Sequence, residues 1–168
     1  VPHTALCGVG DFYYNTPAVL KTILIIFILF ILGFVLYTAY VREIKPISAY
    51  ETKTLHIGNA ELEVLVADTE EKRTRGLMDV TELAADSGMI FVFPDSSTRT
   101  FWNKNTLIPL DLIWVANGRV VGVSALPSIH QSNSQIVSLP SPEAVDWVAE
   151  VNAGWVEAHG IEVGNIVE

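Results

Sequence analysis

Residues 100–115 are TFWNKNTLIPLDLIWV, an apolar stretch interrupted by a short polar group. The group contains two amides, one cation and one carboxylate, at Asn103, Asn105, Lys104 and Asp111. Such side chains are costly to bury unless each finds a partner. The stretch therefore predicts two strands joined by a polar turn, and that turn is where we first look for a functional site.

The two charged residues of this stretch, Lys104 and Asp111, flank the turn NTLIP and are predicted to face one another across it. A partly buried lysine can act as a base or a nucleophile, whereas a plain ion pair would only fix the turn. Trp102 and Asn105 could line a pocket beside them, or Trp102 could simply pack in the core. Arg75, near the end of a predicted helix, is a candidate contact for an anionic ligand.

The charge of the chain is concentrated beyond residue 50. Residues 51–168 hold seven Lys or Arg against seventeen Asp or Glu, a net charge of −10. This argues against nucleic acid as a partner, because phosphates require a basic surface. A solvated acidic surface explains the charge most simply, and a cation-binding role is the alternative.

Metal and cofactor motifs are missing from the sequence. Cys7 is the only cysteine, so we expect neither a disulfide framework nor a cysteine-based metal site. His130 lies on a polar loop without a second histidine at ligand spacing, so no zinc site is predicted. With no phosphate loop and no GxGxxG motif, no cofactor is predicted either.

Residues 22–41 are twenty consecutive residues without a formal charge. As a helix they would span roughly 30 Å, the thickness of the hydrocarbon core of a bilayer. A buried soluble helix would rarely be apolar on every face, and a cleaved signal peptide would need a shorter run and a small-x-small site. We predict an uncleaved single-pass membrane anchor that lies in the lipid bilayer, between an N-terminal tail, residues 1–21, and a linker, residues 42–53. The tail has an aromatic cluster, 12–14, suited to the membrane interface.

Residues 54–168 are predicted to form one β-rich domain. Alternation of apolar and polar residues predicts strands at 54–67, 88–93, 99–104, 107–115, 119–125 and 145–151. Hairpins are expected at Gly58-Asn59, at 95–97 and at Asn117-Gly118. Short helices are expected at 68–75, ending in a left-handed cap at Gly76, at 81–85 and at 155–159. The pattern of 145–151 also fits a short helix, and 166–167 could add an edge strand.

Four motifs occur in order along this domain: RTRGLM at 73–78, SGMIFVFP at 87–94, the stretch at 101–115, and NAGWVEAHGIEVGNIV at 152–167. In order and spacing they resemble the domain-of-unknown-function family 192, from about residue 54 to residue 168. The resemblance implies a small β-rich domain, often exported or membrane-tethered, with no established activity. Two departures stand out. The family usually has Met where this chain has Asn103, and many members have a cysteine pair in the loop that corresponds to 128–135.

The fold class expected from these observations is mainly β (α+β). We predict a compact, mainly antiparallel, β-barrel-like domain with two or three short helices, preceded by one N-terminal transmembrane helix. The flanking charges, Lys21 against Arg42, Lys45 and Lys53, mildly favour a cytoplasmic domain. The resemblance favours an extracytoplasmic domain, which is the orientation we predict.

Three functions remain open from sequence. The leading hypothesis is a tethered extracytoplasmic binding or accessory domain whose pocket, formed by Trp102, Lys104, Asn105, Asp111 and Arg75, binds a small polar or anionic ligand or a peptide. The first alternative is a hydrolase or transferase using Lys104 and Asp111. The second is a structural subunit of a membrane complex, whose partner would be another protein.

Overall fold

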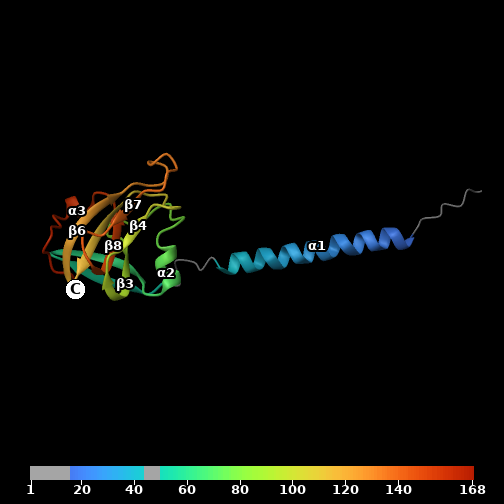
Figure 1. The fold of residues 1–168 in the computed structure, drawn as a ribbon, viewed down its shortest axis with the longest axis horizontal. Helices are drawn as coiled ribbons and strands as arrows, with labels where there is room; N and C mark the ends of the chain where they lie inside the picture. The colour runs from blue at the N-terminus through green and yellow to red at the C-terminus, as the bar shows by residue number, and fades with distance from the viewer. Residues whose placement is uncertain (1–15, 44–49) are drawn as a thin grey trace, which may run out of the picture. The chain divides into compact units, whose positions relative to one another are not determined.

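The structure, a computed structural model, describes residues 16–43 and 50–168, which belong to two separate units, Val1–Ile47 and Ser48–Glu168 (Figure 1). The predictions made for residues 1–15 and 44–49, which include the aromatic cluster, Cys7 and half of the linker, lie outside the described residues. The two units are treated one at a time below.

The first unit contains one helix, α1 (Thr16–Glu43), which is longer than the predicted anchor at both ends. Its segment Ala18–Thr38 has a mean hydropathy of 3.0, and none of that segment is buried within the protein. The hydroxyls of Thr22 and Thr38 donate to the backbone carbonyls of Ala18 and Val35, which satisfies them within the helix. The helix is long and apolar enough to cross a membrane, although a signal sequence near an N-terminus meets the same criteria.

The second unit is built on a six-stranded sheet, with the order β1-β2-β3-β8-β5-β6 (Figure 1). These strands are β1 (Thr52–Ile57), β2 (Ala60–Ala67), β3 (Ser87–Ser97), β5 (Leu110–Ala116), β6 (Arg119–Leu126) and β8 (Val145–Asn152). Neighbouring strands are antiparallel except β2 and β3, which are parallel and are connected through α2 (Glu70–Arg75). A second sheet contains only β4 (Thr100–Trp102) and β7 (Ser138–Pro140). A last helical turn, α3 (Trp155–Ala158), follows β8.

Local turn signals are confirmed where two strands adjoin in sequence. β1 and β2 form a hairpin at Gly58-Asn59, and β5 and β6 form one at Asn117-Gly118. Asn117 and Gly118 have φ of 52° and 67°, the positive values that a type I′ turn needs. Residues 145–151 form a strand, β8, and not the alternative helix.

The predicted hairpin of 88–93 with 99–104 is wrong. β3 continues through Pro94 to Ser97 and pairs with β8, with an irregularity in register between Val92 and Ser97. β4 pairs instead with β7. Consecutive residues of β3, from Met89 to Phe91, are buried, so this strand needs cover on both faces and occupies the centre of the sheet.

Three details of the predicted helices also differ. The cap of α2 is Thr69, whose side chain accepts from the amide of Lys72, whereas Asp68 pairs with the ammonium of Lys72 at 2.6 Å. Gly76 ends the helix with φ 48° and ψ −139°, outside the left-handed region that was predicted. Residues 81–84 are irregular, and no helical turn forms there.

The described part of the domain is a mixed α+β structure, mostly sheet, in which no closed barrel is found. One face of the central strands packs a core that includes Ile113 and Val151, and the other packs a core that includes Leu112 and Phe91. The C-terminal segment bonds to both outer strands, because Val167 bridges Ile57 of β1 and Ile166 bridges Arg119 of β6.

Candidate functional site

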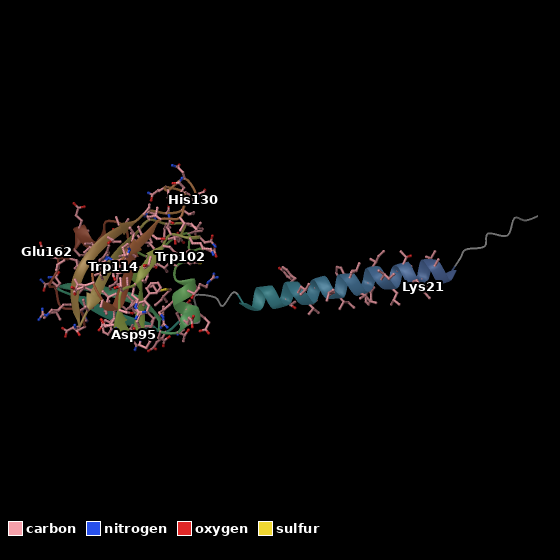
Figure 2. All side chains as sticks on the ribbon, in the orientation of Figure 1. Lys21, Asp95, Trp102, Trp114, His130 and Glu162 are labelled. Carbon is pink, nitrogen blue, oxygen red and sulfur yellow. The ribbon has the colours of Figure 1, made fainter. Side chains whose placement is uncertain are left out.

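A cavity of about 290 Å³ opens on the Phe91 face of the sheet, between α2, the end of β3, β4 and β8. Its walls combine aromatic side chains, cations and one buried acid. The lining residues of interest are Arg73, Arg75, Gly76, Phe91, Phe93, Arg99, Phe101, Trp102, Lys104 and Glu150. In Figure 2 the labelled Trp102 lies on the α2 side of the domain, while Trp114 lies within the sheet.

The apolar wall of the cavity is a set of edge-to-face aromatic contacts. The ring of Phe101 lies 4.8 Å from that of Phe91 and 5.5 Å from that of Trp114, at nearly right angles to both. A Cβ added at Gly76 would lie 3.2 Å from the Phe91 ring, so the glycine allows α2 to end directly against this wall. Packed aromatic rings of this kind give a rigid apolar surface.

Two of the arginines are oriented by fixed contacts. Arg73 donates to the backbone carbonyls of Asp68 and Val92, both at 2.8 Å. Arg99 donates to Asp95 through its carbonyl at 2.6 Å and its carboxylate at 2.9 Å. The guanidinium of Arg99 also lies 4.1 Å from the centre of the Phe93 ring. The hydrogen bond from Arg99 lowers the pKa of the Asp95 carboxyl below its ordinary value.

Arg75 and Arg99, which both line the cavity, nevertheless each have one donor without a partner. The Nε atoms of Arg75 and Arg99 are buried and have no hydrogen-bond partner. A guanidinium nitrogen of Arg75 lies 3.8 Å from the carboxylate of the exposed Asp79. Buried donors without partners are rare in folded proteins, and a bound anion or an ordered water is one of their ordinary explanations.

The cavity concentrates positive charge in an otherwise acidic domain. Four of the seven Lys and Arg residues in 51–168 line it, although that region has a net charge of −10. Charges gathered in a concave, partly apolar site act on a ligand more strongly than the same charges spread over a surface.

Glu150 is the residue that the sequence analysis missed. It lies on β8 opposite Met89 of β3 and Leu112 of β5, and only 5% of it is exposed. Among the described residues its carboxyl has no hydrogen-bond or ion-pair partner. Burial raises its pKa to about 8, so the neutral form predominates at pH 7. The sequence contained a signal for it, since β8 has apolar residues on both faces at Val148 and Ala149, and an acid next to them is expected to be buried.

Three of the five predicted site residues lie at this cavity: Trp102, Lys104 and Arg75. Trp102 is half exposed, and the ammonium of Lys104 lies 5.4 Å from the centre of its ring. Asn105 is not part of the lining. It has φ of 54° and its carbonyl accepts from the amide of Asp79, so its role is to form the turn.

The predicted pair of Lys104 and Asp111 is wrong. Asp111 lies beside Val151 on the other face of the sheet, where its carboxylate accepts from the amides of Gly154 at 2.9 Å and Val156 at 3.3 Å. It therefore caps the first amides of α3. The alternation of side chains along a strand explains the separation, because Asp111 points away from the face that contains the cavity.

Asn103 holds the loop before β7 in place through hydrogen bonds to Ser132 and Val137. It is fully buried; its side-chain oxygen accepts from the amide of Val137, and its amide group donates to Ser132, both at 2.8 Å. The loop in which the family resemblance implies a cysteine pair is therefore tied to β4 by hydrogen bonds in this chain. In the part of the chain that the structure describes, no three His, Cys, Asp or Glu side chains are grouped to hold a metal ion.

Two solved structures are similar to this domain. One is a candidate transcription regulator from Sinorhizobium meliloti 1021, with 31% identity and a TM-score of 0.63, over 71% of this chain and 94% of that chain. The other is a protein of unknown function from Novosphingobium aromaticivorans DSM 12444, with 30% identity and a TM-score of 0.65, over 74% of this chain and 89% of that chain. No curated protein matches the chain. The model of the family DUF192, described as uncharacterized ACR, matches residues 53–168, and the chain belongs to this family.

Proposed function

We propose that the protein is a membrane-tethered binding module whose cavity holds a small anion with an apolar body. The observation that carries this proposal is the pair of buried, unpartnered Nε donors of Arg75 and Arg99 in the wall of one cavity. A guanidinium donates readily to a carboxylate or phosphate oxygen, and such charge-assisted hydrogen bonds are stronger than neutral ones.

The walls of the cavity define the rest of the ligand. Phe91 and Phe101 offer a rigid apolar surface, and Trp102 with Lys104 forms the exposed rim. A volume of about 290 Å³ is at the lower end for small-molecule sites, which favours a ligand smaller than a nucleotide.

We also propose that α1 remains attached and that the domain lies on the extracytoplasmic side. The length and apolar surface of Ala18–Thr38 support an anchor. The family resemblance, with many exported members, supports the orientation. Carbonate washing of membranes from expressing cells should leave the full-length chain in the pellet, and protease added to intact cells should digest the domain. A shortened chain in the soluble fraction would identify a signal sequence instead.

Catalysis by Lys104 and Asp111 is not proposed, because the two side chains lie on opposite faces of the sheet. Nucleic acid is also not proposed as the ligand. Transcription regulation is named for the Sinorhizobium meliloti relative, but the net charge of −10 in residues 51–168 of this chain opposes contact with a phosphate backbone.

The test is a calorimetric titration of the full chain in lipid nanodiscs with 3-phenylpropanoate, phenyl phosphate and inorganic phosphate. We expect saturable binding of at least one of these anions. Arg75→Gln or Arg99→Gln should weaken that binding about 10- to 100-fold, as expected for loss of a charge-assisted hydrogen bond. Arg119→Gln is the matched control, since Arg119 is on β6 and bonds the carbonyl of Gly164 away from the cavity. Equal affinity in all three variants would refute the site.

A further inference from the structure

Resting on the proposed function, we infer that Glu150 is the hydrogen-bond donor of the cavity, and that the ligand is an organic monocarboxylate with an apolar body. In this arrangement the neutral carboxyl of Glu150 donates to one oxygen of the ligand carboxylate. The arginine donors, from α2 and from the segment after β3, contact the same group, and the apolar body lies against the phenylalanine rings.

The position of Glu150 carries the first step of the argument. Its neighbours in the sheet, Met89 and Leu112, are apolar and buried, so the strands on either side offer it no partner. Glu150 is part of the lining of the cavity, and among the described residues its carboxyl has no hydrogen bond or ion pair there. A glutamate that is 95% buried and has no hydrogen-bond partner costs stability. A ligand in the cavity could supply the missing partner.

The surrounding charges decide the protonation state. The charged groups that line the cavity with Glu150 come from α2, from the segment after β3 and from the segment after β4: Glu70, Arg73, Arg75, Arg99 and Lys104. None of these cations is within ion-pair distance of Glu150, and burial alone accounts for its raised pKa. Tyr50, near Arg75, also has a raised pKa and stays neutral in the same range. Glu150 therefore holds its proton near neutral pH and acts as a donor.

The charge balance favours a monoanion. Four cations line the cavity, but Arg99 already bonds Asp95, Arg75 lies near Asp79, and Glu70 is part of the lining. With Glu150 neutral, about one positive charge is left uncompensated. A carboxylate matches this excess, whereas a phosphate dianion exceeds it. A zwitterion would bring an ammonium group, which needs an ionised Glu150.

The experiment is a calorimetric titration of the full chain in nanodiscs with 3-phenylpropanoate at pH 6.5 and pH 9.0, with phenyl phosphate and phenylalanine as comparison probes. Wild type should bind 3-phenylpropanoate best and lose about tenfold in affinity at pH 9.0, because only the fraction with a neutral Glu150 binds. Glu150→Gln keeps a donor but has no proton to lose, so its affinity should be retained and equal at both pH values. Glu150→Leu should bind weakly at both. Glu63→Gln, an exposed glutamate on β2, is the control and should behave as wild type.

The opposing outcomes separate this inference from the proposed function. Binding of 3-phenylpropanoate that is independent of pH and equal in wild type and Glu150→Leu overturns the role of Glu150 but leaves the anion site standing. Tighter binding of phenylalanine, lost in Glu150→Gln, shows that Glu150 is an acceptor and overturns the inference. Tighter binding of phenyl phosphate overturns the monocarboxylate class. If no probe binds the wild type, the inference and the proposed function both fail. The wild-type pH series needs no variant, so it remains decisive if a substitution impairs folding.

Discussion

Asp111 and Glu150 are two buried carboxyl groups on neighbouring strands, β5 and β8, with opposite surroundings. Their exposed fractions are similar, 9% and 5%. Asp111 accepts from two backbone amides, whereas Glu150 has no hydrogen-bond partner among the described residues. The register explains the contrast, since Asp111 lies beside Val151 on one face and Glu150 beside Leu112 on the other. Burial alone therefore does not separate a structural carboxylate from a candidate site residue, while the partners of each do.

The largest expected effect is a pH dependence of stability that comes from Glu150. Its folded pKa of about 8 lies above the ordinary value of 4.5, so between these values the folded state holds a proton that the unfolded state has released. Stability should therefore fall by about 4–5 kcal/mol as pH rises from about 4.5 to 8. Glu150→Gln should remove this fall. Denaturant titrations followed by tryptophan fluorescence measure it, because all four tryptophans are in the second unit.

The same titrations would contradict this account if the fall in stability persisted in Glu150→Gln. The pH dependence would then come from another group. Glu63→Gln again provides a control, because Glu63 is an exposed glutamate on β2 and is not part of the cavity lining.

A smaller effect is expected at Asp111, where the substitution itself lowers the free energy of unfolding. Asp111→Ala should destabilise the domain by about 1–3 kcal/mol, because it leaves the amides of Gly154 and Val156 without an acceptor. Asp111→Asn retains an oxygen and should lose less. Titration of the Asp111→Ala variant with 3-phenylpropanoate should give the wild-type affinity. A loss of affinity would mean that the two faces of the sheet are coupled.

The smallest expected effect is the coupling between Lys104 and Asp111. Lys104→Met should change stability by less than about 0.5 kcal/mol, since the lysine is at an exposed rim. The double variant Lys104→Met/Asp111→Leu should lose the sum of the two single losses within about 0.5 kcal/mol, because the side chains share no partner. If the double variant were instead more stable than the sum of the single losses predicts, the result would support the ion pair predicted from sequence.

Local chemistry made part of the fold predictable. Hairpin turns such as Asn117-Gly118 join strands that adjoin in sequence, and the two hairpins of this type were predicted correctly. The central strand β3 was paired wrongly, because its partner residues in β8 lie 48 to 63 positions further along the chain. Turn residues contain no information about such distant partners. In this sheet, the only indication is that β3 is apolar on both faces, which is typical of a central strand with a neighbour on each side.

The candidate site, like the fold, could be predicted only in part from the sequence. Lys104, Trp102 and Arg75 were identified because charged or aromatic residues in and beside apolar segments draw attention. Asp111 was assigned to the site through its closeness in sequence to Lys104, but strand alternation placed it on the opposite face. Glu150 was missed because the alternation in 145–151 makes it look like an exposed polar residue, although the apolar residues on both faces of the strand indicate a buried one.

The C-terminal segment that bonds both outer strands has a consequence for the order of folding. The backbone groups of His56 and Glu168 exchange hydrogen bonds of 2.7 and 3.0 Å across more than a hundred residues of chain. Closing so large a loop costs more entropy than closing either hairpin, so this contact should form late on the folding pathway. It should also open first, which makes the amides of His56 and Glu168 the expected early sites of hydrogen exchange, while the central strands remain protected.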